Sequence, residues 1–101
     1  MAITVGSFQL TPTVSTQTQI NSDLEFDEAI IYFGTSATDN TNAVEVYVNG
    51  ESDPIPFAPG DKFILNGAGG EELNFSQYDI KTSNGADGIS VIWQRHQPYG
   101  S

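Results

Sequence analysis

The sequence contains no cysteine, a single histidine, and only three basic residues against thirteen acidic ones. Without cysteine the chain has no disulfide framework, no thiolate nucleophile and no cysteine-based metal site. Proteins bind nucleic acid with clustered Lys and Arg, and three basic residues cannot form such a cluster. With a formal net charge of −10, the chain would also be repelled by an anionic membrane. No apolar run approaches the ~18 residues of a membrane span, and residues 1–6 do not resemble a signal peptide. We therefore expect neither a nucleic-acid partner nor a membrane.

Residues for catalysis are equally scarce. The single histidine, His96, lies in a terminal stretch with Pro and Gly, and no Gly-x-Ser-x-Gly sequence positions a serine nucleophile. One histidine cannot supply the several imidazoles of a cupin-type metal centre. No helix with Lys-Ser or Lys-Thr follows the glycine-rich residues 67–70, as a phosphate-binding loop requires. We predict that the protein is not an enzyme and uses no cofactor.

What the chain does contain favours β-structure. Hydrophobic residues make up 38% and aromatic residues 11%, mostly the β-favouring Ile, Val, Phe and Tyr. Short apolar stretches are separated by turn residues at intervals of about ten positions, and 101 residues suit one domain. The pattern predicts an all-β fold: a single-domain antiparallel β-sandwich, jelly-roll or Ig-like, with about 7–8 short strands.

Local signals place several of these strands. Residues 3–10 read as a first strand with a bulge at Gly6, and the apolar run 29–33 fits a central strand. Asn49-Gly50, directly after an alternating Val-rich stretch, predicts a hairpin turn. The prolines of residues 53–61 exclude a central strand there, and Pro59-Gly60 predicts a turn.

The chain divides into three parts. Residues 1–20 form an N-terminal strand and an extended Thr-rich arm, residues 21–95 the sandwich body, and residues 96–101 an irregular tail. The arm either adds to a neighbouring subunit or is an ordinary edge strand of its own sandwich. Uncharged side chains in the arm and the tail are the candidate interface residues: Thr11, Pro12, Thr13, Val14, Pro98 and Tyr99.

Two groups of side chains have both a functional and an ordinary interpretation. Asp23, Glu25 and Asp27 share one face if they lie on a strand, where their oxygens suit Ca²⁺; otherwise they form a solvated acidic surface. No EF-hand pattern accompanies them, so we predict no metal. Trp93, with tyrosines at positions 32, 47 and 78, either lines a sugar-binding platform or fills the core, which we favour for Trp93.

The order of motifs over residues 44–95 resembles a known class of proteins. A Val-rich strand and Asn49-Gly50 are followed by Pro59-Gly60-Asp61 and a short strand, and the last strand alternates as Val91-Ile92-Trp93. This is similar to small β-sandwich structural proteins of tailed bacteriophage virions, in which a Pro-Gly-acidic turn leads into a strand.

The resemblance implies a capsid cement (decoration) protein that binds the outer capsid surface and stabilises the head. Its partner would be the major capsid protein, it would be a homo-oligomer with a trimer favoured, and it would be made in the host cytoplasm. A tail, baseplate or head-fibre component is the alternative within the same class. A carbohydrate-binding β-sandwich module is a further alternative outside it.

Overall fold

The computed structural model describes residues 3–35, 38–49, 51–67 and 73–96, and these are predominantly β-structure. Within them, seven strands have three or more residues, five have two, and η2 (Phe75–Gln77) is a short 3-10 helix. The strands are β1 (Ile3–Leu10), β2 (Thr18–Gln19), β3 (Glu25–Phe26), β4 (Glu28–Tyr32), β5 (Gly34–Thr35), β6 (Thr38–Asp39), β7 (Val44–Val48), β8 (Ile55–Phe57), β9 (Lys62–Asn66), β10 (Leu73–Asn74), β11 (Tyr78–Lys81) and β12 (Ile89–His96). The predicted single-domain antiparallel β-sandwich is confirmed.

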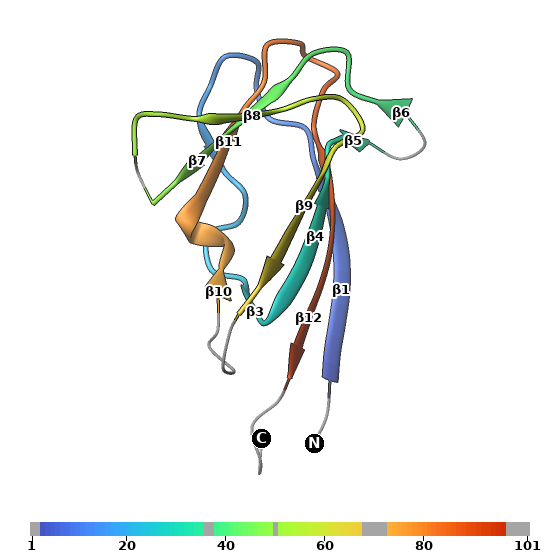
Figure 1. Ribbon diagram of the computed structural model, residues 1–101, viewed down its shortest axis with the longest axis vertical. Coiled ribbons are helices and arrows are strands. Elements are labelled where there is room, and N and C mark those ends of the chain that lie inside the picture. Colours follow the sequence, from blue (N-terminus) through green and yellow to red (C-terminus); the bar gives the residue numbers. More distant parts are fainter. Residues whose placement is uncertain (1–2, 36–37, 50, 68–72, 97–101) are drawn as a thin grey trace.

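Two four-stranded antiparallel sheets form the layers of the sandwich (Figure 1). Sheet A has the strand order β1-β12-β4-β9, and sheet B has the order β2-β11-β7-β8. Two short ribbons, β3 with β10 and β5 with β6, complete the pairing. The run 29–33 contributes β4, which lies inside sheet A between β12 and β9, as predicted for a central strand.

The core lies between the sheets and follows the two-residue period of the strands. In β4, Ala29 and Ile31 are buried. Aromatic rings connect the two layers: Phe57 of sheet B stacks on Phe33 and on Phe63, with ring centroids 4.4 Å and 5.1 Å apart. Each large apolar side chain buried in this way contributes about 1.5–3 kcal/mol.

The predicted hairpin forms, and its second strand comes from the proline-rich stretch. β7 pairs with β8 with Val46 opposite Ile55, and Asn49 has the positive φ of 53° that the turn needs; Gly50 lies outside the described residues. β8 is an edge strand, because proline has no backbone N–H to donate to a second neighbour. The Pro59-Gly60 turn also forms, with Gly60 at φ 82°.

The bulge predicted at Gly6 is wrong. β1 pairs with β12 without interruption from Ile3 opposite His96 to Leu10 opposite Ile89, and Gly6 lies opposite Trp93. A Cβ atom at Gly6 would lie 2.6 Å from Cζ2 of Trp93. Glycine stands here because it leaves room for the indole, which is a packing requirement and not a backbone one. β12 also extends to His96, one residue beyond the expected end of the body.

The Thr-rich segment after β1 follows the surface of its own sandwich. The Ser15 amide donates to the carbonyl of Thr82 at 2.8 Å, and Ser15 has a φ of 59°. Thr18 of β2 then lies opposite Ile80 of β11, so β2 is the edge strand of sheet B. Of the two alternatives for this segment, the contacts within one chain are those of an edge strand.

Candidate functional site

The outer face of sheet A carries a group of exposed aliphatic side chains. These are Ile3 and Val5 on β1, Ile92 on β12, Ile30 on β4 and Ile64 on β9, and we call them the isoleucine face. Their exposed fractions run from 43% at Ile30 to 68% at Val5 and Ile64. Scattered exposed apolar residues are ordinary, but a contiguous group on one sheet marks an interaction surface.

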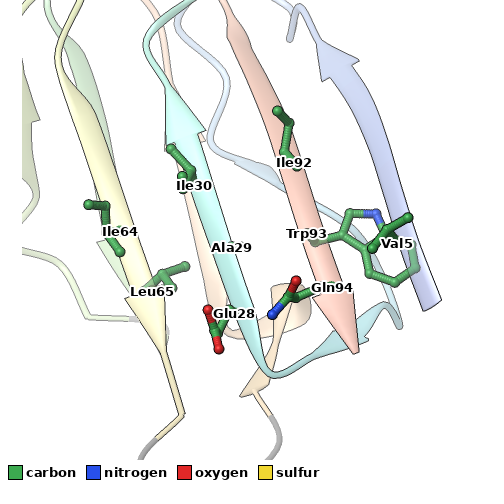
Figure 2. Close-up of a pocket in the computed structure, with 9 residues that line it drawn as sticks. All are labelled: Val5, Glu28, Ala29, Ile30, Ile64, Leu65, Ile92, Trp93 and Gln94. Carbon is green, nitrogen blue, oxygen red and sulfur yellow. The ribbon is translucent and has the colours of Figure 1, made fainter. Parts of the chain in front are cut away.

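Strand register brings these side chains together. Ile92 lies opposite Ile30, and Ile30 lies opposite Ile64, so three isoleucines from three neighbouring strands form one row. Directly opposite residues point to the same face of a sheet, so the row is continuous. Figure 2 shows the three side chains on β9, β4 and β12, with Glu28 and Gln94 beside them on the next row.

A depression of about 190 Å³ lies on this side of sheet A, lined by residues of all four strands (Figure 2). Its lining is mainly apolar and includes Val5, Ile30, Ile64 and Ile92. Between Ile92 and Ile64 the row contains only Ile30. The surface therefore suits an apolar protein contact more than a polar small molecule.

Sheet A is also the part of this acidic chain that is nearly free of acidic side chains. Its four strands contain one carboxylate, Glu28, and two basic side chains, Lys62 and Arg95, so twelve of the thirteen acidic residues lie outside them. On the outer face the four strands carry one charge of each sign, Glu28 and Lys62, and the Asp39 carboxylate of β6 accepts from the Tyr32 hydroxyl at the end of this face. Charged side chains are depleted at the centres of protein interfaces, because burying them unpaired is costly.

The inner face beneath this surface is held by a close-packed row. Trp93 lies between two small residues, Gly6 on β1 and Ala29 on β4. The indole is partly buried against the core, in agreement with the preference for a core role. Because Trp93 occupies the space over Gly6, it fixes the position of β1 relative to the rest of the sheet.

The predicted interface residues of the arm are mostly accessible. Thr11, Thr13 and Val14 are exposed, with Val14 at 42%, whereas Pro12 is buried. Pro98 and Tyr99, the candidates of the tail, lie outside the described residues. A role for Thr11, Thr13 and Val14 in subunit contacts stays a prediction.

The structure does not bring the three acidic candidates of residues 23–27 into one site. Only Glu25 lies on β3, and the chain bends at Asp27 before β4. Glu25 Oε1 lies 4.0 Å from Arg95 Nη2, while Asp23 Oδ1 accepts from Asn74 Nδ2 at 3.4 Å. In the described part of the chain, no group of three or more His, Cys, Asp or Glu side chains is placed to hold a metal ion.

The aromatic residues considered for a sugar platform are also separated. Tyr47 and Tyr78 belong to sheet B and are buried, at 7% and 9% exposure. Trp93 and Tyr32 belong to sheet A, where the indole turns toward the core. The side chain of His96 lies outside the described part of the structure.

Sequence reasoning missed a buried polar cluster that joins two loops. The Asp87 carboxylate, 2% exposed, accepts from the amides of Thr41 and Asn42 at 2.8 and 2.9 Å. The Asn40 side chain exchanges two hydrogen bonds of 2.9 Å with the backbone of Gly88. The sequence signal was weak, since Asp87-Gly88 reads only as part of a turn. All of these groups are hydrogen-bonded, so the cluster holds the fold together and offers no reactive group.

A scan against protein-family models finds no match to this chain, and neither does a search of the curated proteins. Nothing helical in the described ranges is long and apolar enough to cross a bilayer.

Proposed function

We propose that this chain is a non-enzymatic structural protein of a tailed bacteriophage, a cement subunit that attaches to the outer capsid surface through its isoleucine face. The observation that carries the proposal is the row Ile92–Ile30–Ile64, exposed on a sheet whose four strands contain a single carboxylate, Glu28. The resemblance over residues 44–95 supplies the class of particle.

The isoleucine face provides a driving force for attachment. Fully burying one isoleucine contributes about 1.5–3 kcal/mol, and these side chains are roughly half exposed, so each adds on the order of 1 kcal/mol when covered. Association itself costs about 4–15 kcal/mol in lost freedom. A single copy of the face therefore binds weakly, and attachment gains from several linked copies on a repeating lattice of sites.

The charge distribution supports an outside position. With twelve of the thirteen acidic residues outside the strands of sheet A, attachment through the isoleucine face buries few carboxylates. A position inside the shell would put a chain of charge −10 against packaged DNA, which is itself a polyanion. The major capsid protein is the partner that this arrangement fits.

The direct test is binding of the purified protein to heads of the phage that encodes it, assembled without this protein. Ile64→Lys puts a charge into the isoleucine face, and Ile55→Lys makes the same change on sheet B, where Ile55 is 57% exposed. We expect Ile64→Lys to abolish co-sedimentation with heads and Ile55→Lys to retain it. Equal loss in both variants would show that the isoleucine face is not the attachment surface.

Location on the particle tests the remaining part of the proposal. Immunogold labelling of intact virions should decorate heads. Labelling confined to tails would replace the cement role by that of a tail, baseplate or fibre component. Specific binding to a glycan array that Trp93→Ala abolishes without unfolding would favour the carbohydrate-binding module instead.

A further inference from the structure

We propose that β1 of one copy pairs antiparallel with β1 of a second copy, joining two A sheets into one continuous eight-stranded sheet. The site is the long side of β1 that faces away from β12, at the edge of sheet A. This inference concerns how two copies of the chain assemble: it puts a two-fold dimer in place of the trimer that the resemblance implies, and it does not depend on what the isoleucine face binds.

The four sheet edges differ in their protection against such pairing. β2 has only two residues, β8 has three and contains Pro56, and β9 begins with the exposed Lys62. Short strands, proline and lysine are the devices that prevent edge-to-edge association. β1 has eight residues, contains neither proline nor any charged residue, and pairs with β12 without a bulge. Of these edges, it is the one built like an interior strand.

The occupant is a second copy of the chain, because β1 meets the condition that the net charge sets for self-association. Two chains of net charge −10 repel each other wherever acidic surfaces approach, so self-association requires an uncharged contact. β1 supplies one, and its neighbour β12 has Arg95 as its single residue of fixed charge. The side chains that a second β1 would cover include Ile3 and Val5, exposed at 56% and 68%.

Symmetry restricts the register. A two-fold axis that relates two antiparallel edge strands stands perpendicular to the sheet, so the outer face of one copy continues into the outer face of the other. Val5 and Ser7 are exposed on that face, and directly opposite residues point to one face. The central registers therefore place Val5 opposite the partner's Val5, Val5 opposite the partner's Ser7, or Ser7 opposite the partner's Ser7.

The pairing places the isoleucine faces of both copies on the same side of one continuous sheet, where the two-fold axis relates them. Each copy then contributes its row Ile92–Ile30–Ile64 to one continuous sheet, and the contact itself contains no acidic residue.

The first experiment is sedimentation equilibrium of the full chain. Ser7→Lys introduces on β1 the residue type that protects natural edges, and Ser52→Lys makes the same change in an exposed loop. Both variants have a net charge of −9 in place of −10. We expect a dimer for the wild type and for Ser52→Lys, and a dissociation constant raised about tenfold or more for Ser7→Lys, because each copy then brings an unpaired charge of the same sign into the strand pair. A monomer at all concentrations, or a trimer, overturns the proposal.

The second experiment uses the absence of cysteine from the chain. Opposite residues of an antiparallel pair have Cα atoms about 4.5–5.5 Å apart, which is within the range of a disulfide. We expect oxidation to cross-link Val5→Cys, or Ser7→Cys, or an equimolar mixture of the two, and to leave Ser52→Cys uncross-linked. Cross-linking of none of the three β1 combinations overturns the proposal, even where Ser7→Lys lowers the dimer content.

A third measurement separates this inference from the proposed function. Ile64 lies on β9, at the opposite edge of sheet A from β1. The variant Ile64→Lys should dimerise as the wild type does, whether or not it binds heads. Loss of the dimer in Ile64→Lys would mean that copies associate through their faces, and the edge pairing would be wrong.

Discussion

The indole of Trp93 occupies the space that a side chain at Gly6 would fill: a Cβ there would lie 2.6 Å from Cζ2 and 2.7 Å from Cε2. Gly6 and Trp93 are opposite each other in the β1–β12 pair. A large aromatic ring on one strand thus covers a glycine on the next, and it replaces the packing that glycine lacks. This contact holds β1 against the sheet and so supports both the isoleucine face and the edge at which we propose that two copies meet.

Gly6→Ala should therefore destabilise the protein. In an ordinary strand, replacing glycine with alanine is favourable by about 0.5–1 kcal/mol. Here the added methyl group displaces the indole, and overpacking of this kind costs about 1–3 kcal/mol, so the free energy of unfolding should fall. Urea unfolding measures the change, and a shift in the fluorescence of Trp93, the only tryptophan, should accompany it. An unchanged or higher stability would mean that the ring can move aside at no cost.

Two glycines in the 83–88 turn should respond differently to the same substitution. A Cβ at Gly88 would lie 2.2 Å from the carbonyl oxygen of Leu10, which is backbone and cannot rotate away. A Cβ at Gly85 meets nothing within 4 Å. We expect Gly88→Ala to lower stability by about 3 kcal/mol or more, and Gly85→Ala to leave it unchanged or raise it by about 0.4–1 kcal/mol. Thermal unfolding of both variants tests this expectation, and equal melting temperatures for Gly88→Ala and Gly85→Ala would contradict it.

The Asp87 carboxylate should be necessary for the junction of the two loops. Asp87→Ala leaves the amides of Thr41 and Asn42 without their acceptor in a buried place. Hydrogen bonds to a charged group contribute about 1.5–3 kcal/mol each, so we expect a loss of that order or larger. Asp87→Asn keeps one acceptor oxygen and should recover part of the loss. Denaturant unfolding of the three proteins gives the ranking, and equal stability of all three would remove the role assigned to Asp87.

Stability at alkaline pH should depend on Tyr78. Burial raises the pKa of the Tyr78 phenol above its usual value of 10.0. Below that pH the phenol is neutral in both the folded and the unfolded chain. At higher pH the unfolded chain releases the proton more readily, so the free energy of unfolding falls until the pKa of the folded state is passed. Tyr78→Phe removes this contribution, and its stability should fall less steeply between pH 9 and 11 than that of the wild type. If the free energy of unfolding fell equally with pH in the wild type and in Tyr78→Phe, Tyr78 would not contribute to the loss of stability at alkaline pH.

Much of the fold could be predicted because its signals are local. Proline and glycine restrict the backbone wherever they occur, so the edge position of β8 and the turn at Gly60 followed from those residues alone. The central position of β4 followed from an uninterrupted apolar run. These features depend on a few adjacent residues, and no distant contact overrides them.

The candidate site was harder to predict, for a physical reason. The run Ala29-Ile30-Ile31 reads as a strand buried on both faces, and nothing in it indicates that one face has no covering layer. Likewise, alternation suggested that Asp23, Glu25 and Asp27 share a face, but the bend at Asp27 separates them. The role of Gly6 depended on a tryptophan 87 positions away in the chain, so a local reading gave a bulge.

The sequence by itself determined an acidic, cysteine-free β-sandwich with its turns and its proline-marked edge, since composition and short-range backbone restrictions suffice for these. Only the tertiary structure decided which aliphatic side chains stay in contact with water, because exposure depends on how the strands are ordered and on what lies over each sheet. Strand order set Ile92, Ile30 and Ile64 in one row and left β1 at the edge. Both proposals follow from that order.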